Sequence, residues 1–429
     1  MTEALKTDGR GGFAGLDACV HCGFCLQACP TFLATGDEAD SPRGRIELMR
    51  ALERGDLPIT DAALSFHLDR CLGCRGCEPV CPSGVHYGHG LEEARARLAK
   101  ALGVPFLTRL ALWALTSPGV SGVVYWFARL LRATGLPRRL AGWGRMRFAM
   151  GMLAATRPQG GNGRYRAVTG GRMIEDTAAR SRPLPPVTAL LFRGCVMQGL
   201  FSHVHAATVR TLSINGYSVR EAPAQVCCGA LHVHAGLIDE ARALARTNIA
   251  AFGASDEPIV VNSAGCGAWM KEYGRELADA GAQNFSSRVR DVSELIAGDG
   301  TTPPIAGAPL DLHVAYDPPC HLLHAQRISA APLALFAAIP LLRLVTVPGA
   351  AECCGSAGLF TLVEPEMSRA VLAPKLERLR EATPQVVATG NPGCLMQIGA
   401  GLAAAGVPTR VRHPIELLDD SYRAAGRYE

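Results

Sequence analysis

Sixteen cysteines supply most of the chemistry available to this 429-residue chain. The first eight form two runs with one spacing, C-x2-C-x2-C-x3-C-P, which are Cys19, Cys22, Cys25 and Cys29 before Pro30, and Cys71, Cys74, Cys77 and Cys81 before Pro82. Three closely spaced thiolates can wrap one corner of a cubane cluster, and in this run the fourth cysteine ligates the other cluster. The two runs therefore predict two [4Fe–4S] clusters.

The same rule predicts which cysteines share a cluster. Cluster 1 takes Cys19, Cys22, Cys25 and Cys81, and cluster 2 takes Cys71, Cys74, Cys77 and Cys29. Structural zinc is the alternative, but three tightly spaced cysteines plus a distant fourth do not favour its tetrahedral geometry. Two clusters in series indicate an electron relay. We expect His21 and His86, beside the motifs, to form local hydrogen bonds and not to act as ligands.

The other eight cysteines form an internal repeat. Cys195, Cys227, Cys228 and Cys266 recur as Cys320, Cys353, Cys354 and Cys394, at offsets of 125 to 128 residues, and each copy contains a Cys-Cys-Gly turn. Each copy collects four thiols from three loops, which can hold a further metal centre. The alternative is that these cysteines are small buried apolar residues. The shared pattern favours a metal in at least one copy, and we expect the nearby histidines to support it without ligating it: His232, His234, His321 and His324.

The elements that position these cysteines can be read from hydrophobic patterning. Each copy alternates short apolar runs with helical patterns, which predicts α/β units with parallel sheets and the cysteines at the carboxyl ends of strands. We expect an α+β multidomain protein, in which a mostly helical ferredoxin-like domain with two [4Fe–4S] clusters precedes two duplicated α/β domains. The predicted units are residues 1–100, a basic apolar connector and linker at 101–180, and the repeats at 181–305 and 306–429. The segment between the two cysteine motifs is predicted to be helical.

Charge is distributed unevenly along the chain. The net charge is +5, yet residues 94–174 contain fourteen Lys and Arg and no Asp or Glu, so the remainder is net −9. This asymmetry calls for a negatively charged partner, either phospholipid head groups or an acidic protein face.

The connector contains an uncharged window at residues 110–128. Tryptophans and arginines accompany it, which favours helices lying in a membrane interface, and a buried helical pair docking on a partner subunit is the alternative. Ser117, Pro118 and Gly119 interrupt the window, which argues against a true membrane span.

Several other classes of protein are disfavoured. The composition, 48% hydrophobic, excludes wholesale disorder, and the length and cysteine distribution do not match a secreted disulfide scaffold. The first residues carry no apolar signal-peptide core, which leads us to expect a cytoplasmic protein. The chain has no nucleic-acid reading module, so no nucleic-acid partner is expected. It also has no G-x-G-x-x-G helix opening, P-loop or nucleophile elbow, so we expect no flavin or nicotinamide site and no catalytic residue.

Longer segments show a specific resemblance. Two ferredoxin motifs followed by two CCG repeats are the architecture of the cysteine-rich-domain oxidoreductase subunits. Within that group the chain is most similar to the glycolate oxidase iron–sulfur subunit family, over nearly its whole length. The segments that carry the resemblance are CVHCGFCLQACPTFLATGDEADSPRGRIELM, RCLGCRGCEPVCPSGVHYGHG, DPPCHLLHAQRI, CCGSAGLF and HPIELLDDSY.

The resemblance implies a relay subunit. It implies FAD-binding partner subunits that oxidise glycolate to glyoxylate, and a quinone-type acceptor at the inner face of the cytoplasmic membrane. The alternatives are the same relay for lactate or glycerol 3-phosphate, a catalytic CCG protein like heterodisulfide reductase, and a zinc-bound assembly protein. In the heterodisulfide reductase pattern each repeat ends in C-x-x-C, and here Trp269 and Gln397 occupy the last positions, which weakens the catalytic alternative.

Overall fold

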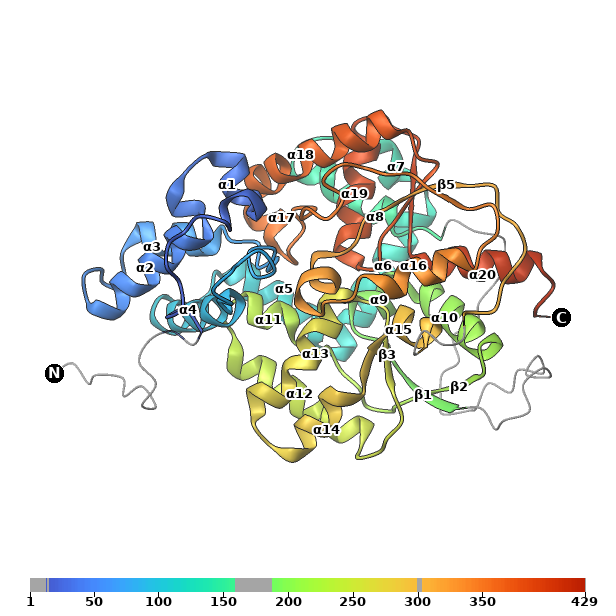
Figure 1. Cartoon of the computed structure of the whole chain (residues 1–429), viewed down its shortest axis with the longest axis horizontal. Helices are drawn as coiled ribbons and strands as arrows, with labels where there is room; N and C mark the ends of the chain where they lie inside the picture. Colours follow the sequence, from blue (N-terminus) through green and yellow to red (C-terminus); the bar gives the residue numbers. More distant parts are fainter. Residues whose placement is uncertain (1–12, 14, 159–186, 299–302, 429) are drawn as a thin grey trace.

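The computed structural model describes residues 13, 15–158, 187–298 and 303–428 (Figure 1). The predicted linker between the connector and the first repeat falls mainly on residues 159–186, outside the described residues.

The N-terminal unit is helical, as predicted. The segment between the two cysteine motifs forms a helix (α2) that begins at Pro42, where the Ser41 side chain accepts a hydrogen bond from the Gly44 backbone N–H, and ends before Gly55 in the left-handed conformation. The elements of this unit are η1 (Leu26–Ala28), α1 (Pro30–Thr35), η2 (Glu38–Asp40), α2 (Pro42–Arg54), α3 (Ala62–Asp69) and α4 (Tyr87–Leu102).

The connector forms four helices. They are α5 (Phe106–Thr116), α6 (Pro118–Ala133), α7 (Leu136–Leu140) and α8 (Arg145–Ala155). Pro118 begins α6, so the uncharged window of the sequence is divided between two helices. In the described part of the chain no single helix is long and apolar enough to cross a membrane, although α4 and α5, which meet at a bend of 114°, pass that test as a pair.

The first repeat is an α/β unit with a four-stranded parallel sheet in the order β2-β1-β3-β4. Its strands are short and mostly buried, as the apolar runs predicted. Its elements are β1 (Val187–Phe192), α9 (Val196–Leu200), α10 (Ser202–Ile214), β2 (Tyr217–Glu221), α11 (Ala230–His234), α12 (Ile238–Phe252), β3 (Ile259–Val261), α13 (Ala264–Leu277), α14 (Ala280–Arg288), β4 (Val289–Asp291) and α15 (Val292–Ala297).

The second repeat reproduces this topology, with a parallel sheet in the order β6-β5-β7-β8. The identical strand order confirms the duplication and the predicted fold class. Its elements are β5 (His313–Tyr316), the π-type turn η3 (His321–Ala325), α16 (Ala330–Ala337), β6 (Arg343–Leu344), α17 (Phe360–Val363), α18 (Pro365–Ala382), β7 (Val386–Ala388), α19 (Pro392–Ala404), β8 (Arg410–Arg412) and α20 (Pro414–Ala424).

The two repeats pack on each other with approximate twofold symmetry. Helix α10 of the first repeat contacts α20 of the second, and α15 of the first contacts α16 of the second. Because α10 corresponds to α16 and α15 corresponds to α20, the same contact is made twice. One apolar core runs through both sheets, from Leu191 of β1 to Val386 of β7. Arg210 donates two hydrogen bonds, of 2.8 and 2.7 Å, to the carboxylate of Asp419 across the contact. The repeats therefore form one body.

The N-terminal unit and the connector both rest on this body (Figure 1). Helix α1 lies against α18 of the second repeat, and α4 lies against α11 of the first. Helix α6 packs on α9 of the first repeat, and α8 packs on α19 of the second. This arrangement brings loops from the N-terminal unit and both repeats to one place.

Candidate iron–sulfur centres

The structure brings Cys19, Cys22, Cys25 and Cys81 together around one cavity. Cys22 is exposed and the other three are partly buried. Arg50 on α2 orders the loop of the first motif by donating hydrogen bonds to backbone oxygens, including that of Cys19 at 3.2 Å. The cavity is lined by these four thiols and by Cys77, and otherwise largely by apolar groups, so its donor set fits a cubane cluster.

A second cavity is lined by Cys29, Cys71, Cys74 and Cys77, the other predicted set. The Tyr87 hydroxyl donates to the Cys71 sulfur at 3.6 Å, and the Gly73 backbone N–H donates to the same sulfur at 3.4 Å. Cys77 lines both cavities, so the two thiol sets are direct neighbours.

The burial of the thiols in both cavities suits a bound cation. Burial raises the pKa of Cys25, Cys29 and Cys77, which disfavours free thiolates there. A thiolate is the form that ligates metal, so bound iron would supply the positive charge that stabilises it. The donor sets and their burial therefore fit [4Fe–4S] clusters.

A buried ion pair supports the second cavity. Arg45 and Asp40 have no exposed side-chain surface, and Arg45 Nη2 lies 3.1 Å from Asp40 Oδ1. The same carboxylate contacts His67 Nδ1 and Arg70 Nη1, each at 3.0 Å, and so connects η2 with α2 and α3. The Cys29 thiol donates to the Asp40 backbone oxygen at 3.6 Å. The network thus holds the loop that carries Cys29.

The four cysteines of the second repeat are in mutual contact. Cys354 Sγ lies 3.1 Å from Cys394 Sγ, and Cys353 is hydrogen-bonded to both Cys320 and Cys354. Gly355 follows with a φ of 80°, and its N–H donates to the Cys353 sulfur at 3.4 Å. This left-handed backbone, which glycine adopts without strain, folds the adjacent thiols into one site.

Charged groups surround the second-repeat thiols. Its hydrogen-bond contacts with Cys353 and Cys394 lower the pKa of Cys354, and Lys375 acts in the same direction. Lys375 is itself buried, pairs with the buried Asp317 and donates to the Ala350 backbone oxygen at 2.8 Å. The hydrogen bond with Cys353 and the neighbouring His321 likewise lower the pKa of Cys320, so the site favours thiolate, the ligating form, at two of its cysteines.

Cys74 connects this site to the N-terminal unit. Its side chain is hydrogen-bonded to Cys353, a contact that lowers the pKa of Cys74, and it also lines the cavity of the predicted cluster 2. Five cysteines therefore meet at the second repeat, although the sequence assigned only four to it.

The first repeat gathers its four cysteines in the same way. Cys195 Sγ lies 3.4 Å from Cys227 Sγ, and Cys228 is hydrogen-bonded to both Cys227 and Cys266. The bond to Cys195 lowers the pKa of Cys227, whereas the bond to Cys227 raises the pKa of Cys195. In the first repeat one thiol, Cys227, is thus shifted toward its ionised form by its neighbours, whereas the second repeat has two such thiols, Cys320 and Cys354.

Three buried polar atoms around the first-repeat thiols have no hydrogen-bond partner within the described residues. They are the Tyr125 hydroxyl, His232 Nδ1 and Trp269 Nε1. Tyr125 and His232 lie close enough to Cys227 to interact electrostatically, and Trp269 Nε1 lies 3.2 Å from where a Cβ on Gly229 would stand. Buried polar groups are normally satisfied, so these atoms fit a bound group with acceptor atoms, such as the sulfides of an iron–sulfur centre.

Asn391 joins the two repeat sites. Its Nδ2 donates to the Cys394 sulfur at 3.7 Å, and its Oδ1 accepts from the Gly265 N–H at 3.2 Å, next to Cys266. Asn391 and its partner Ser263, whose hydroxyl donates at 3.3 Å, each lie three residues before the last cysteine of their repeat. The repeats therefore meet through equivalent positions.

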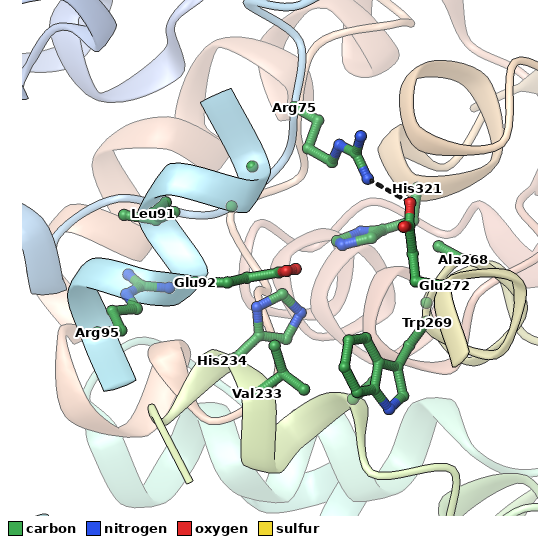
Figure 2. Close-up of a pocket in the computed structure, with 14 residues that line it drawn as sticks. Arg75, Leu91, Glu92, Arg95, Val233, His234, Ala268, Trp269, Glu272 and His321 are labelled. Carbon is green, nitrogen blue, oxygen red and sulfur yellow. Dashed lines mark hydrogen bonds and ion pairs between the residues drawn. The ribbon is translucent and has the colours of Figure 1, made fainter. Parts of the chain in front are cut away.

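A polar pocket lies where the N-terminal unit meets the repeats (Figure 2). Figure 2 shows Glu92 of α4, His234 of α11, Glu272 of α13 and His321 of η3 directed toward a common space. The rings of His234 and His321 are 5.5 Å apart. Burial raises the pKa of Glu92 to about 7, although Arg275 Nη2 lies only 3.4 Å from this carboxylate.

The histidines of the sequence analysis take several positions. Burial lowers the pKa of His234 to about 3, so it is neutral, whereas the Cys320 thiolate outweighs burial and raises the pKa of His321, whose Nδ1 lies 3.5 Å from Cys320 Sγ. His324 Nε2 lies 3.4 Å from the Ala351 backbone oxygen. His21 Nε2 lies 2.9 Å from Arg50 Nη1, and His86 stacks on His89.

The two positions that lack the C-x-x-C cysteine have different surroundings. Trp269 lines the polar pocket (Figure 2) and belongs to the same apolar cluster as Cys227 and Cys228. Gln397 is buried and bonded to Thr361 and Ser368, at 2.9 and 2.8 Å. Neither side chain can replace a thiol in disulfide exchange.

The sequence did not identify Tyr125, Asn391 or Glu92 as parts of these sites. Alignment of the repeats could have found Asn391, because it matches Ser263. Tyr125 stands in an apolar stretch and Glu92 in an ordinary amphipathic helix, and neither pattern signals contact with a distant loop.

Comparison with protein families matches most of the cysteine-bearing sequence. Residues 15–85 match the 4Fe-4S dicluster domain, and residues 189–271 and 314–399 match the cysteine-rich domain of the CCG type.

Individual relatives extend over the whole chain. The chain is 32% identical to the probable glycolate oxidase iron-sulfur subunit of Bacillus subtilis, over 95% of this chain and 94% of that protein. It is 32% identical to the glycolate oxidase iron-sulfur subunit of Escherichia coli, over 98% of each. Lactate utilization protein A of Geobacillus kaustophilus is 30% identical over 53% of this chain and 97% of its own length.

Proposed function

Since the chain belongs to the family of glycolate oxidase iron–sulfur subunits, and so binds two [4Fe–4S] clusters as part of an oxidoreductase complex, we propose a specific role within such a complex. The chain relays electrons from FAD-containing partner subunits, which oxidise glycolate to glyoxylate, to a quinone-type acceptor. It does so at the cytoplasmic face of the membrane.

The observation that carries this proposal is an unbroken series of thiol sites. Cys77 lines both N-terminal cavities, Cys74 contacts Cys353 of the second repeat, and Asn391 connects the second-repeat cysteines with those of the first. A series of neighbouring metal sites suits electron transfer.

The residues have distinct roles in this proposal. Cluster 1 is held by Cys19, Cys22, Cys25 and Cys81, and cluster 2 by Cys71, Cys74, Cys77 and Cys29. Further iron–sulfur centres are held by Cys195, Cys227, Cys228 and Cys266, and by Cys320, Cys353, Cys354 and Cys394. Bound iron–sulfur clusters supply one-electron chemistry, while the protein sets their potential through burial and hydrogen bonds to sulfur. Tyr87, the Gly73 N–H and the Gly355 N–H make such bonds here.

The exposed edge of the first cavity suits the flavin partner. Cys22 is exposed there, and Val20 and Phe24 on the same loop are 70% and 67% exposed. Burial of such exposed apolar side chains by a partner protein would stabilise the complex. We place the FAD-containing subunit at this edge.

A relay for lactate oxidation is the second candidate. Lactate utilization proteins of this type match about half of the chain, and the partner subunit would select the substrate in either case. Trp269 and Gln397 argue against thiol–disulfide chemistry here.

The proposal is tested in the assembled complex by Cys77→Ser. This change should abolish acceptor reduction while anaerobic stopped-flow still shows the flavin reduced by glycolate at the wild-type rate. Ala63→Ser, on the exposed side of α3, is the matched control and should change neither step. Loss of flavin reduction in the Cys77 variant, or unimpaired acceptor reduction, would refute the relay. Replacing glycolate by lactate as the reductant distinguishes the two candidates.

A further inference from the structure

Helices α5 and α6 carry apolar side chains on their outward side. Phe106, Leu110 and Trp113 recur at helical spacing on α5 and are exposed, Phe106 by 76%. On α6 the exposed residues are Val123, Val124, Trp126, Phe127 and Leu130, with Trp126 58% exposed. A helix of a globular protein normally turns its apolar stripe inward, so this surface, the α5–α6 face, is built to be covered.

The helices are firmly seated on their other side. Leu112 of α5 and Tyr125 of α6 are buried. Arg129 Nε donates to the Gly199 backbone oxygen at 2.7 Å, and Arg132 Nη1 donates to the Leu200 backbone oxygen at 3.1 Å. The outward orientation of the apolar side chains is therefore fixed by packing against the first repeat.

Unpaired arginines border the α5–α6 face. Arg138, Arg139 and Arg157 form no hydrogen bond or ion pair through their side chains within the described ranges, and residues 94–174 contain no acid that could pair with them. Arg138 and Arg157 line a cleft of about 840 Å³ between α6, α7, α8 and β8, together with Arg132 and Arg410. Arg132 of α6 lines this cleft, so the cleft adjoins the helix that carries part of the apolar face.

We propose that the α5–α6 face lies in the interface of an anionic phospholipid bilayer, with lipid phosphates bound at the arginines beside it. This inference rests on the proposed function in one respect, namely that the electron acceptor of the relay is in the membrane. An apolar helical face with tryptophans, bordered by basic residues, binds membranes through buried apolar area and attraction to anionic lipids. In this proposal both helices lie along the surface, because their exposed apolar side chains are on one side while Leu112 and Tyr125 on the other side are buried.

Charge distinguishes this face from the apolar edge assigned to the flavin partner. Val20 and Phe24 have the acidic residues Asp17, Glu38 and Glu47 in the neighbouring loop and helices, where Glu38 pairs with Arg43 and Glu47 with Arg54, so this edge carries no excess of positive charge to attract anionic lipid. Helices α5 and α6 themselves carry no acidic residue, and Glu240 of α12, which reaches α5, is paired with Arg109 at 3.6 Å, so the excess of positive charge lies at this face and we assign only this face to the membrane.

The assignment gives α6 a second role. Tyr125 faces the first-repeat cysteines, while its neighbours Trp126 and Phe127 face outward. A helix is about 10 Å across with its side chains, so only this thickness separates those cysteines from the lipid. In this proposal the first-repeat cysteines thus lie beside the lipid and within reach of a lipid-soluble acceptor.

Vesicle sedimentation of the purified, cluster-containing chain tests the inference. We expect binding to vesicles of equal parts phosphatidylcholine and phosphatidylglycerol, and much weaker binding to phosphatidylcholine alone. Trp126→Ser with Phe127→Ser should lower the partition constant at least tenfold. Arg138→Gln with Arg139→Gln should lower it about fivefold per arginine on anionic vesicles only, as expected for basic residues near a charged membrane. Phe66→Ser, which removes an exposed apolar side chain from α3, is the matched control and should bind as wild type.

Three results would overturn the inference. They are equal binding to neutral and anionic vesicles, wild-type binding by the Trp126/Phe127 double variant with its circular dichroism unchanged, and loss of the flavin partner by that variant. The last would show that a protein covers the face. Electron transfer to a water-soluble acceptor, measured on the same samples, separates this outcome from failure of the relay, because the surface variants should keep that activity.

Discussion

Replacing Asp40 by Asn should destabilise the N-terminal unit strongly. Arg45 and Asp40 are both fully buried, and the change would leave the Arg45 guanidinium without its carboxylate partner. Removing one member of a buried ion pair costs about 3–5 kcal/mol. Arg45 would keep hydrogen bonds to the His67 backbone oxygen at 2.6 Å and to Thr31 Oγ1 at 3.0 Å, so we expect the lower end, about 3 kcal/mol.

This loss is large compared with the total free energy of unfolding, about 5–15 kcal/mol for a typical domain. It should also weaken cluster 2, because the Asp40 backbone oxygen holds the Cys29 side chain. Urea titration, followed both by far-ultraviolet circular dichroism and by the visible absorption of the clusters, measures the two effects together. The midpoint should fall without a change in slope.

A matched control lies two residues away. Glu38 forms an ion pair with Arg43 at 2.6 Å, but its side chain is 51% exposed, so Glu38→Gln should cost no more than about 1 kcal/mol. Combining Asp40→Asn with Arg45→Met should recover part of the loss, since the double variant leaves no unpaired arginine there. If Asp40→Asn cost no more than Glu38→Gln, our view of the buried pair as a support for cluster 2 would be wrong.

Three further predictions concern other parts of the chain. The pKa of Glu92 is raised by burial to about 7 from an ordinary value of 4.5, so its protonated form favours folding and this contribution is lost as the pH rises through 7. Between pH 6 and pH 8 the free energy of unfolding should fall by about 1.3 kcal/mol, and Glu92→Gln should remove that part of the pH dependence of thermal unfolding. An unchanged pH dependence in the variant would contradict the assigned role of Glu92. Lys375→Met should lower the free energy of unfolding, measured by urea titration, by about 3–5 kcal/mol because its buried aspartate partner stays unpaired. Arg378→Gln, at a partly exposed ion pair on the same helix, should lower it by about 1 kcal/mol or less. Equal losses in the two variants would contradict this prediction. Phe24→Ser should slow electron transfer from the flavin partner at limiting concentration and leave cluster content intact, while Phe66→Ser should not; identical rates would mean that the partner docks elsewhere.

The cluster-binding chemistry of this chain could be read from local spacing. The two C-x2-C-x2-C-x3-C-P runs predicted both four-cysteine sets, and the structure places each set around its own cavity. The helix between the motifs and the strands before Cys195 and Cys320 also follow from capping residues and apolar runs. These signals are local, because a run of neighbouring residues determines both the helix and the cysteine spacing.

Contacts between distant segments could not be read in this way. The sequence placed Cys74 in one cluster, and only packing of the N-terminal unit against the second repeat brings it to Cys353. In the sequence, Tyr125 is one of several apolar residues in an uncharged window. In the structure, α6 begins at Pro118 and packs on the first repeat, which places Tyr125 near Cys227 and its neighbours on the outward side.

By itself, then, the sequence determined the number of thiol sets, the duplication and the unequal distribution of charge. The tertiary structure decided the order in which the thiol sites adjoin one another, and which side of the connector helices is left exposed. The physical reason is that cysteine spacing and helical periodicity are properties of short segments. Adjacency of sites depends on how the sheets, helices and N-terminal unit bury their apolar faces against each other.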